Sequence, residues 1–135
     1  MSDFVLFLCP HNAAKSVIAA AYFDQMAAAA GLSLRAVSAG TEPSAQVVPI
    51  VAGLLQGEGF DVSGFQPRHV TDAELQQAHR VISMGCEPAD LALASDRLER
   101  WDDVPPASQD LAGSSGAIRQ HIEQLLTDLK AAGVQ

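Results

Sequence analysis

The stretch FVLFLCPHNAAKSVIAAA, residues 4–21, decides how the chain folds. It begins with an apolar run typical of a buried strand, crosses a short polar loop that starts at Cys9, and ends in an alanine-rich segment that predicts a helix. A strand, loop and helix in this order bring the loop amides and the positive end of the helix dipole to one small space. That space suits a tetrahedral oxyanion and favours a thiolate at Cys9.

The rest of the chain continues the alternation of strands and helices. Strands are predicted at 32–39, 80–84 and 98–101, and helices at 16–30, 47–56, 71–78 and 117–132, with loops at 60–70, 87–96 (containing a helical turn) and 102–116. This pattern predicts a single α/β domain over residues 1–135 with helices on both faces of a four-stranded parallel sheet. For the strands within the sheet we assume the order 2-1-3-4. In such sheets, ligands bind at the carboxyl ends of the strands, where Cys9, Gly40, Cys86 and Asp102 follow.

Composition excludes several classes of function. The formal net charge of −8 argues against non-specific binding of nucleic acid or of an anionic membrane, since both require a basic surface. No apolar run approaches the ~20 residues of a membrane span, and no basic segment precedes the first apolar run, so we expect a cytoplasmic protein. The two cysteines are too few for a disulfide framework or a structural zinc site, and the histidines lack metal-ligand spacing, so we expect no metal.

Four ordered segments carry recognisable motifs. Cys9 is followed by five residues and then by Lys15 and Ser16; residues 38–43 read SAGTEP, residues 81–86 read VISMGC, and residues 101–103 read WDD. Together they resemble the low-molecular-weight protein tyrosine phosphatase fold, and within it the arsenate reductases. The resemblance covers nearly the whole chain and implies that family's fold.

The resemblance also implies roles for individual residues. Cys9 would be the nucleophile, assisted by Lys15 and Ser16, and Cys86 would be a second, redox-active thiol. Asp103 is the first candidate for a general acid and Asp102 the second. The oxyanion-binding loop would consist of Pro10, His11, Asn12, Ala13, Ala14, Lys15 and Ser16.

The sequence departs from the family pattern at three places. Lys15 stands where the family has an arginine, which keeps the positive charge but loses the two parallel hydrogen bonds of a guanidinium. The Asp-Pro pair of the acid loop appears as DDVPP at residues 102–106, which leaves the register of the aspartate open. The further cysteine of thioredoxin-linked relatives is absent, because residues 88–90 are Pro-Ala-Asp.

Each candidate residue also has a structural interpretation. Cys9 or Cys86 could be a buried apolar thiol, and Lys15 could be a solvated helix residue. The two aspartates could form an exposed acidic turn. If the sheet order is as predicted, however, Cys9 and Cys86 follow neighbouring strands about 4.8 Å apart, within reach of a disulfide after modest loop movement.

These observations support one leading hypothesis and two alternatives. The leading hypothesis is thiol-dependent reduction of arsenate to arsenite, with no bound cofactor and with thioredoxin, glutaredoxin or a low-molecular-weight thiol as external reductant. The first alternative is a phosphatase that passes through a phosphocysteine at Cys9; because residues 107–109 are Ala-Ser-Gln, no aromatic clamp for phosphotyrosine is expected. The second is an oxyanion-binding homologue weakened by Lys15.

Overall fold

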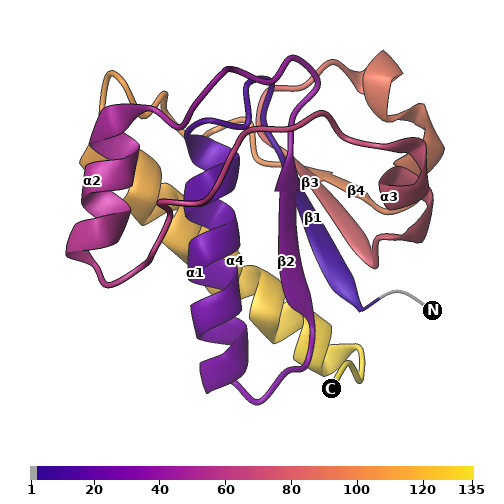
Figure 1. Ribbon diagram of the computed structural model, residues 1–135. Coiled ribbons are helices and arrows are strands. Elements are labelled where there is room, and N and C mark those ends of the chain that lie inside the picture. The colour runs from indigo at the N-terminus through magenta and orange to yellow at the C-terminus, as the bar shows by residue number, and fades with distance from the viewer. Residues whose placement is uncertain (1–2) are drawn as a thin grey trace.

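The computed structural model describes residues 3–135 and contains a four-stranded parallel sheet in the order β2-β1-β3-β4, as predicted (Figure 1). The elements follow one another as β1 (Phe4–Leu8), α1 (Lys15–Ala29), β2 (Arg35–Ala39), α2 (Pro49–Gly57), α3 (Asp72–Gln77), β3 (Arg80–Ser83), the 3₁₀ segment η1 (Pro88–Ala94), β4 (Leu98–Arg100) and α4 (Leu111–Ala131). The central strand β1 pairs with β2 on one side and with β3 on the other.

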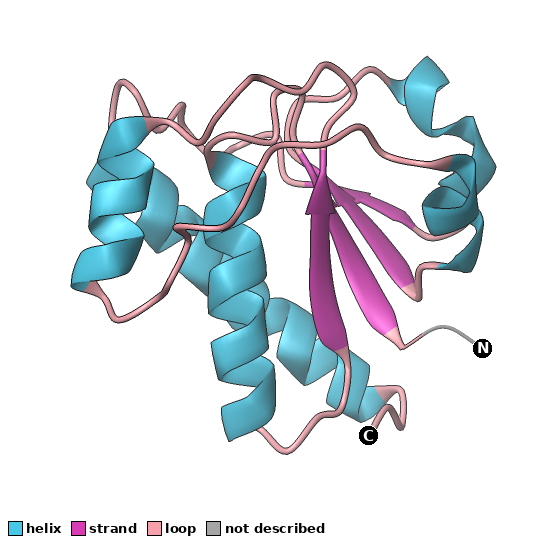
Figure 2. Cartoon of the chain, in the orientation of Figure 1, coloured by secondary structure: helices cyan, strands magenta, loops and turns pink. Residues whose placement is uncertain are grey.

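Helices cover both faces of the sheet, which confirms the predicted layers (Figure 2). Successive β1 side chains point to opposite faces, so Val5 and Phe7 enter the core beneath α1, α2 and α4, whereas Leu6 and Leu8 enter the core beneath α3 and η1. Both sides of β1 are therefore buried. This burial holds the carboxyl end of the strand, and the loop that follows it, in one place.

Most of the predicted elements form close to their expected bounds. The capping box predicted at the start of the helix over 71–78 is present, with Thr71 and Glu74 bonding each other's backbone N–H groups. The strand expected from residue 32 begins later, at Arg35.

The predicted start of the last helix, residue 117, was wrong. Residues 111–116 belong to α4 rather than to the preceding loop, because the Asp110 side chain caps the helix by accepting a 2.8 Å hydrogen bond from the Gly113 N–H. The glycines and serines of this turn have low helix propensity, which hid the start of the helix. Pairing of Gly113 with this cap leaves no room for a side chain, since an added Cβ would meet the Asp110 carboxylate.

Candidate active site

Cys9 directly follows β1 and lies at the start of α1, with only 4% of its surface exposed. The Ser16 N–H donates a hydrogen bond to the Cys9 sulfur at 3.4 Å, and the Ser16 hydroxyl oxygen lies 3.1 Å from the same sulfur. The structure thus brings the predicted nucleophile and its predicted hydroxyl partner together.

The loop between Cys9 and α1 is held from outside through its carbonyl groups. The carbonyl oxygens of residues 10, 11 and 13 accept hydrogen bonds from the N–H groups of residues 42, 44 and 48, at 2.7, 3.0 and 2.9 Å. By contrast, the N–H groups of residues 11–14 have no hydrogen-bond acceptor among residues 3–135. Unpaired amide donors in a concave loop at a helix N-terminus are typical of an anion-binding site.

Asn12 fixes the shape of this loop. Its backbone has a φ of 50°, the only positive φ of a non-glycine residue between residues 3 and 135, and its side chain is fully buried. The side-chain oxygen accepts from the Arg68 N–H at 3.0 Å, and the side-chain nitrogen donates to the Ser16 hydroxyl at 2.8 Å. Because the Ser16 oxygen accepts from Asn12, its own hydrogen is free to point at the Cys9 sulfur.

Gly40 forms the back wall of the loop. A Cβ atom at this position would lie 2.6 Å from the Pro10 carbonyl oxygen, 2.9 Å from the Cys9 carbonyl oxygen and 3.0 Å from the Asn12 Cβ. Only glycine allows the loop to approach β2 so closely. The SAGTEP motif therefore supports the loop by providing both this contact and the N–H donor of Glu42.

A cavity of about 230 Å³ opens beside Cys9. Lys15 and His11 line it, and Lys15 makes no ion pair with a carboxylate anywhere in residues 3–135, so its charge is available to a ligand. The Nδ1 atom of His11 lies 3.0 Å from the Glu42 carbonyl oxygen and so ties the loop to the following segment. The cavity lining contains no phenylalanine, tyrosine or tryptophan.

Five residues of the cavity wall were not among the predicted site residues. They come from two loops that the fold brings to the same edge of the sheet: Ser44, Val48, Pro106, Ala107 and Ser108. Ser44 directly follows the SAGTEP motif, and Ala107 directly follows the acid-loop prolines, so their position in the sequence could have indicated them.

Cys86 lies at the predicted edge of the sheet but packs away from Cys9. It follows β3 through Gly85, whose φ of 97° turns the chain, and its side chain joins the core beneath α3 and η1. Burial, chiefly, and the neighbouring Cys9 raise the pKa of the Cys86 thiol, while a weak hydrogen bond from the Thr41 hydroxyl, 3.9 Å from the sulfur, lowers it. A Cys9–Cys86 bond therefore requires residues around Gly85 to move.

The two candidate acids do not line the cavity. Asp102 is paired with the Arg100 guanidinium at 2.9 Å, and Asp103 lies 2.7 Å from the His121 ring nitrogen. The hydrogen bond from His121 lowers the pKa of the Asp103 carboxyl, which keeps it ionised at neutral pH. His121 in turn stacks on Trp101, which is buried in the core, as expected for this residue.

Two other classes of site are not found in the described chain. Residues 3–135 contain no cluster of three or more potential metal-ligating side chains, and none of their helices is long and apolar enough to cross a membrane.

The fold and the thiol-centred anion loop together define an enzyme class whose members act on oxyanions through a cysteine. The chain belongs to the low molecular weight phosphotyrosine protein phosphatase family, whose model matches residues 4–105. This agrees with the family resemblance of the four sequence motifs, and the family contains both arsenate reductases and phosphatases.

Two of the individual relatives are named as arsenate reductases. A Halobacterium salinarum protein named "Putative arsenate reductase" is 30% identical over 125 residues, covering 91% of this chain and 87% of that protein. The thioredoxin-dependent arsenate reductase of Corynebacterium glutamicum has 26% identity and a TM-score of 0.82, with 97% of this chain and 63% of that chain covered. YfkJ from Bacillus subtilis has 25% identity and a TM-score of 0.82, covering 98% and 97%.

Proposed function

We propose that this protein reduces arsenate to arsenite by a thiol mechanism centred on Cys9. The observation that carries the proposal is the ring of unpaired loop N–H groups around a buried thiol, with a second cysteine at the end of the adjoining strand. The likeness to proteins named as arsenate reductases supports the same reaction.

In the first step, the loop amides and the Lys15 ammonium would hold arsenate against the Cys9 sulfur. The thiolate attacks arsenic, an S–As bond forms, and one arsenate oxygen leaves as water after protonation. The proton would come from Asp103 or Asp102 after the acid loop has moved, because both carboxylates now pair with Arg100 or His121. The carboxylate that serves would first take up a proton from water, and loss of the His121 hydrogen bond would favour this at Asp103. Transfer of the Asp103 side chain from His121 to the cavity is the conformational step that this role requires.

In the second step, a thiolate attacks the Cys9 sulfur, so that an S–S bond forms and the S–As bond breaks. The electron pair of the broken bond stays on arsenic, which is reduced from As(V) to As(III) and leaves as arsenite. We assign the attacking thiol to Cys86, or to a small-molecule thiol if Cys86 remains buried. Thioredoxin, glutaredoxin or a low-molecular-weight thiol would then reduce the disulfide.

A phosphatase reaction is the second candidate, and one observation favours it. The Ser16 hydroxyl beside Cys9 would stabilise a departing thiolate as well as an attacking one, as hydrolysis of a phosphocysteine requires. The walls contributed by Pro106 and Ala107 carry no aromatic ring, so small phosphate esters fit this cavity better than phosphotyrosine.

Arsenite formation in the presence of each class of reductant tests the proposal. Wild-type protein should produce arsenite with at least one of thioredoxin, glutaredoxin or a low-molecular-weight thiol, and Cys9→Ser should produce none. If no reductant yields arsenite, while a chromogenic phosphate ester is hydrolysed by wild type and by Cys86→Ser but not by Cys9→Ser, the phosphatase reaction replaces reduction. If neither reaction occurs in wild type but Lys15→Arg creates one, the protein is a weakened homologue.

A further inference from the structure

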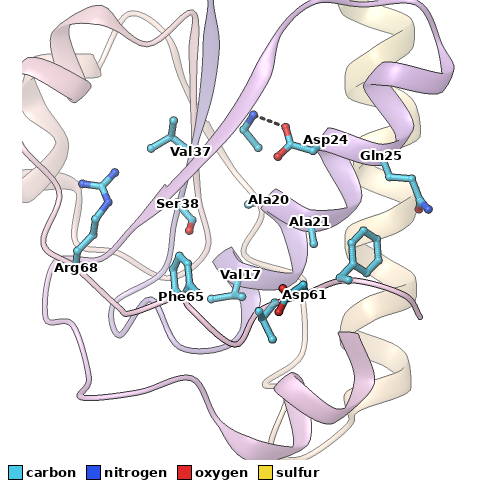
Figure 3. Close-up of a pocket in the computed structure, with 13 residues that line it drawn as sticks. Val17, Ala20, Ala21, Asp24, Gln25, Val37, Ser38, Asp61, Phe65 and Arg68 are labelled. Atoms are coloured by element: carbon cyan, nitrogen blue, oxygen red, sulfur yellow. Dashed lines mark hydrogen bonds between the residues drawn. The ribbon is translucent and has the colours of Figure 1, made fainter. Parts of the chain in front are cut away.

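A second cavity, of about 690 Å³, lies between α1, β2 and the segment over residues 60–68 (Figure 3). It shares no lining residue with the cavity beside Cys9. Its floor consists of small side chains on α1, among them Val17, Ala20 and Ala21, and Phe65 stands at its margin. The catalytic proposal uses none of these residues.

The open edge of β2 forms one side of this groove. β2 is the terminal strand of the sheet, and its backbone groups alternate between facing β1 and facing away. The Arg35 N–H bonds toward β1, to the carbonyl of Asp3 directly before that strand. The N–H groups of Ala36 and Gly40 bond outward, to the Asp24 carboxylate and to the Arg68 carbonyl. The backbone N–H of Ser38, which lies between these two residues, must therefore face away from β1 as well.

The Ser38 N–H has no hydrogen-bond acceptor in the part of the chain that the structure describes, although the residue is only 7% exposed. Buried backbone donors are seldom left unpaired without a reason. Asp24 covers the edge on one side of Ser38, and the bridge between Gly40 and His69 covers it on the other. The free edge is thus one residue long, too short for pairing with another sheet but suited to one residue of an extended peptide.

A peptide residue opposite Ser38 in antiparallel register would exchange two backbone hydrogen bonds with it. Side chains alternate along a strand, and Ala36 packs on the α1 side of the sheet, so the side chain of this peptide residue would point onto the α1 floor.

The charges at the groove specify the kind of side chain. Figure 3 shows Asp24 and Asp61 on either side of Ala20 and Ala21. The Asp61 carboxylate accepts hydrogen bonds from Ser63, which lower its pKa and keep it anionic. The Arg68 guanidinium is paired with Glu74 and so offers no free positive charge. An aliphatic stem with a cationic head fits an apolar floor flanked by two carboxylates.

We infer that the groove between α1 and β2 is a docking site for an extended peptide segment of a partner protein that pairs with Ser38 and lays a lysine or arginine side chain between Asp24 and Asp61. Backbone pairing supplies the orientation, and the two carboxylates select the basic side chain. The site lies apart from the Cys9 cavity and does not depend on the reaction catalysed there.

Titration of the ¹⁵N-labelled protein with a blocked pentapeptide, acetyl-Ala-Val-Lys-Val-Ala-amide, tests this inference by NMR. We expect the Ser38 amide proton to shift downfield and to gain protection from exchange, together with shifts at Ala20 and Ala21. A peptide with glutamate in place of lysine should bind at least about fivefold more weakly, since it brings a like charge to both carboxylates. N-methylation of the central amide should weaken binding about twofold to tenfold, the effect of one hydrogen bond.

Variants separate charge recognition from folding. Asp24→Asn keeps the acceptor for the Ala36 N–H, and Asp61→Asn keeps the acceptor for Ser63, so both should fold while each weakens binding of the lysine peptide about twofold to fivefold. Asp96→Asn, an equal change of charge at an exposed position outside the groove, should leave binding unchanged. Equal binding of the lysine and glutamate peptides, or no change at Ser38 with millimolar peptide, would overturn the inference.

Discussion

Substitution of Gly40 by alanine should damage the anion loop without changing any catalytic side chain. The added Cβ would meet two carbonyl oxygens at 2.6 and 2.9 Å, those of Pro10 and Cys9, and neither can move independently of the backbone. An ordinary carbon–oxygen contact is several tenths of an ångström longer, so the loop must shift away from β2 and weaken the hydrogen bond from Glu42 to the Pro10 carbonyl.

The expected cost follows from overpacking of a closely packed contact. Forced shifts of this kind destabilise a fold by about 1–3 kcal/mol, which for a domain of this size lowers Tm by about 3–12 °C. Binding of arsenate or phosphate should weaken at least tenfold, because the loop N–H groups no longer converge on one point. Thermal unfolding and isothermal titration with each oxyanion measure the two effects.

Gly53→Ala provides the matched control. Gly53 lies exposed in α2 with no atom within 4 Å of an added Cβ, so alanine should stabilise the helix by about 0.5–1 kcal/mol and leave oxyanion binding unchanged. If Gly40→Ala unfolds at the wild-type temperature and binds oxyanion as tightly as wild type, the close approach of β2 does not shape the loop, and the argument from Gly40 is refuted.

Three further predictions concern the charges around the site. Cys9→Ser removes the neighbouring negative charge and should move the midpoint of the pH dependence of Cys86 alkylation to lower pH; an unchanged midpoint would contradict the coupling of the two thiols. Because the folded-state pKa of Asp103 is lowered, its pairing with His121 should stabilise the fold above the unfolded pKa of about 3.9 and lose this effect as the pH falls through the lowered value. The destabilisation caused by His121→Ala should therefore be smaller in acid, where only the loss of stacking on Trp101 remains, than at neutral pH; equal destabilisation in chemical denaturation at both pH values would contradict this. Lys15→Arg should tighten oxyanion binding severalfold through a second hydrogen bond, measured by titration; weaker binding would mean that the cavity is shaped for lysine.

The sequence predicted the parts of this protein that depend on local pattern. Apolar runs and turn residues were sufficient for the four strands, whose assumed order the structure confirms, and the spacing of Cys9 and Ser16 was sufficient to place both at one helix start. The start of α4 was missed because its stability comes from the Asp110 cap and from burial of its inner face, which outweigh the weak propensity of the first turn.

Positions that depend on tertiary contacts could not be predicted from pattern. The face on which Cys86 lies is set by the turn at Gly85, and the direction of Asp103 is set by His121, 18 residues away on α4. The unpaired Ser38 N–H likewise could not be predicted, because Asp24 on α1 and the segment beside His69 determine which outward-facing groups of β2 are covered.

The central claim is that Cys9 and Cys86 together supply the two electrons that reduce arsenate. Mass spectrometry of the reduced protein after a single turnover with arsenate, without any external thiol, tests it most directly. The account predicts one Cys9–Cys86 disulfide for each arsenite released, and neither product in Cys9→Ser. Wild-type protein that forms neither arsenite nor the disulfide under these conditions, but releases arsenite once a low-molecular-weight thiol is added, would contradict it, because the second pair of electrons would then come from the external thiol and not from Cys86.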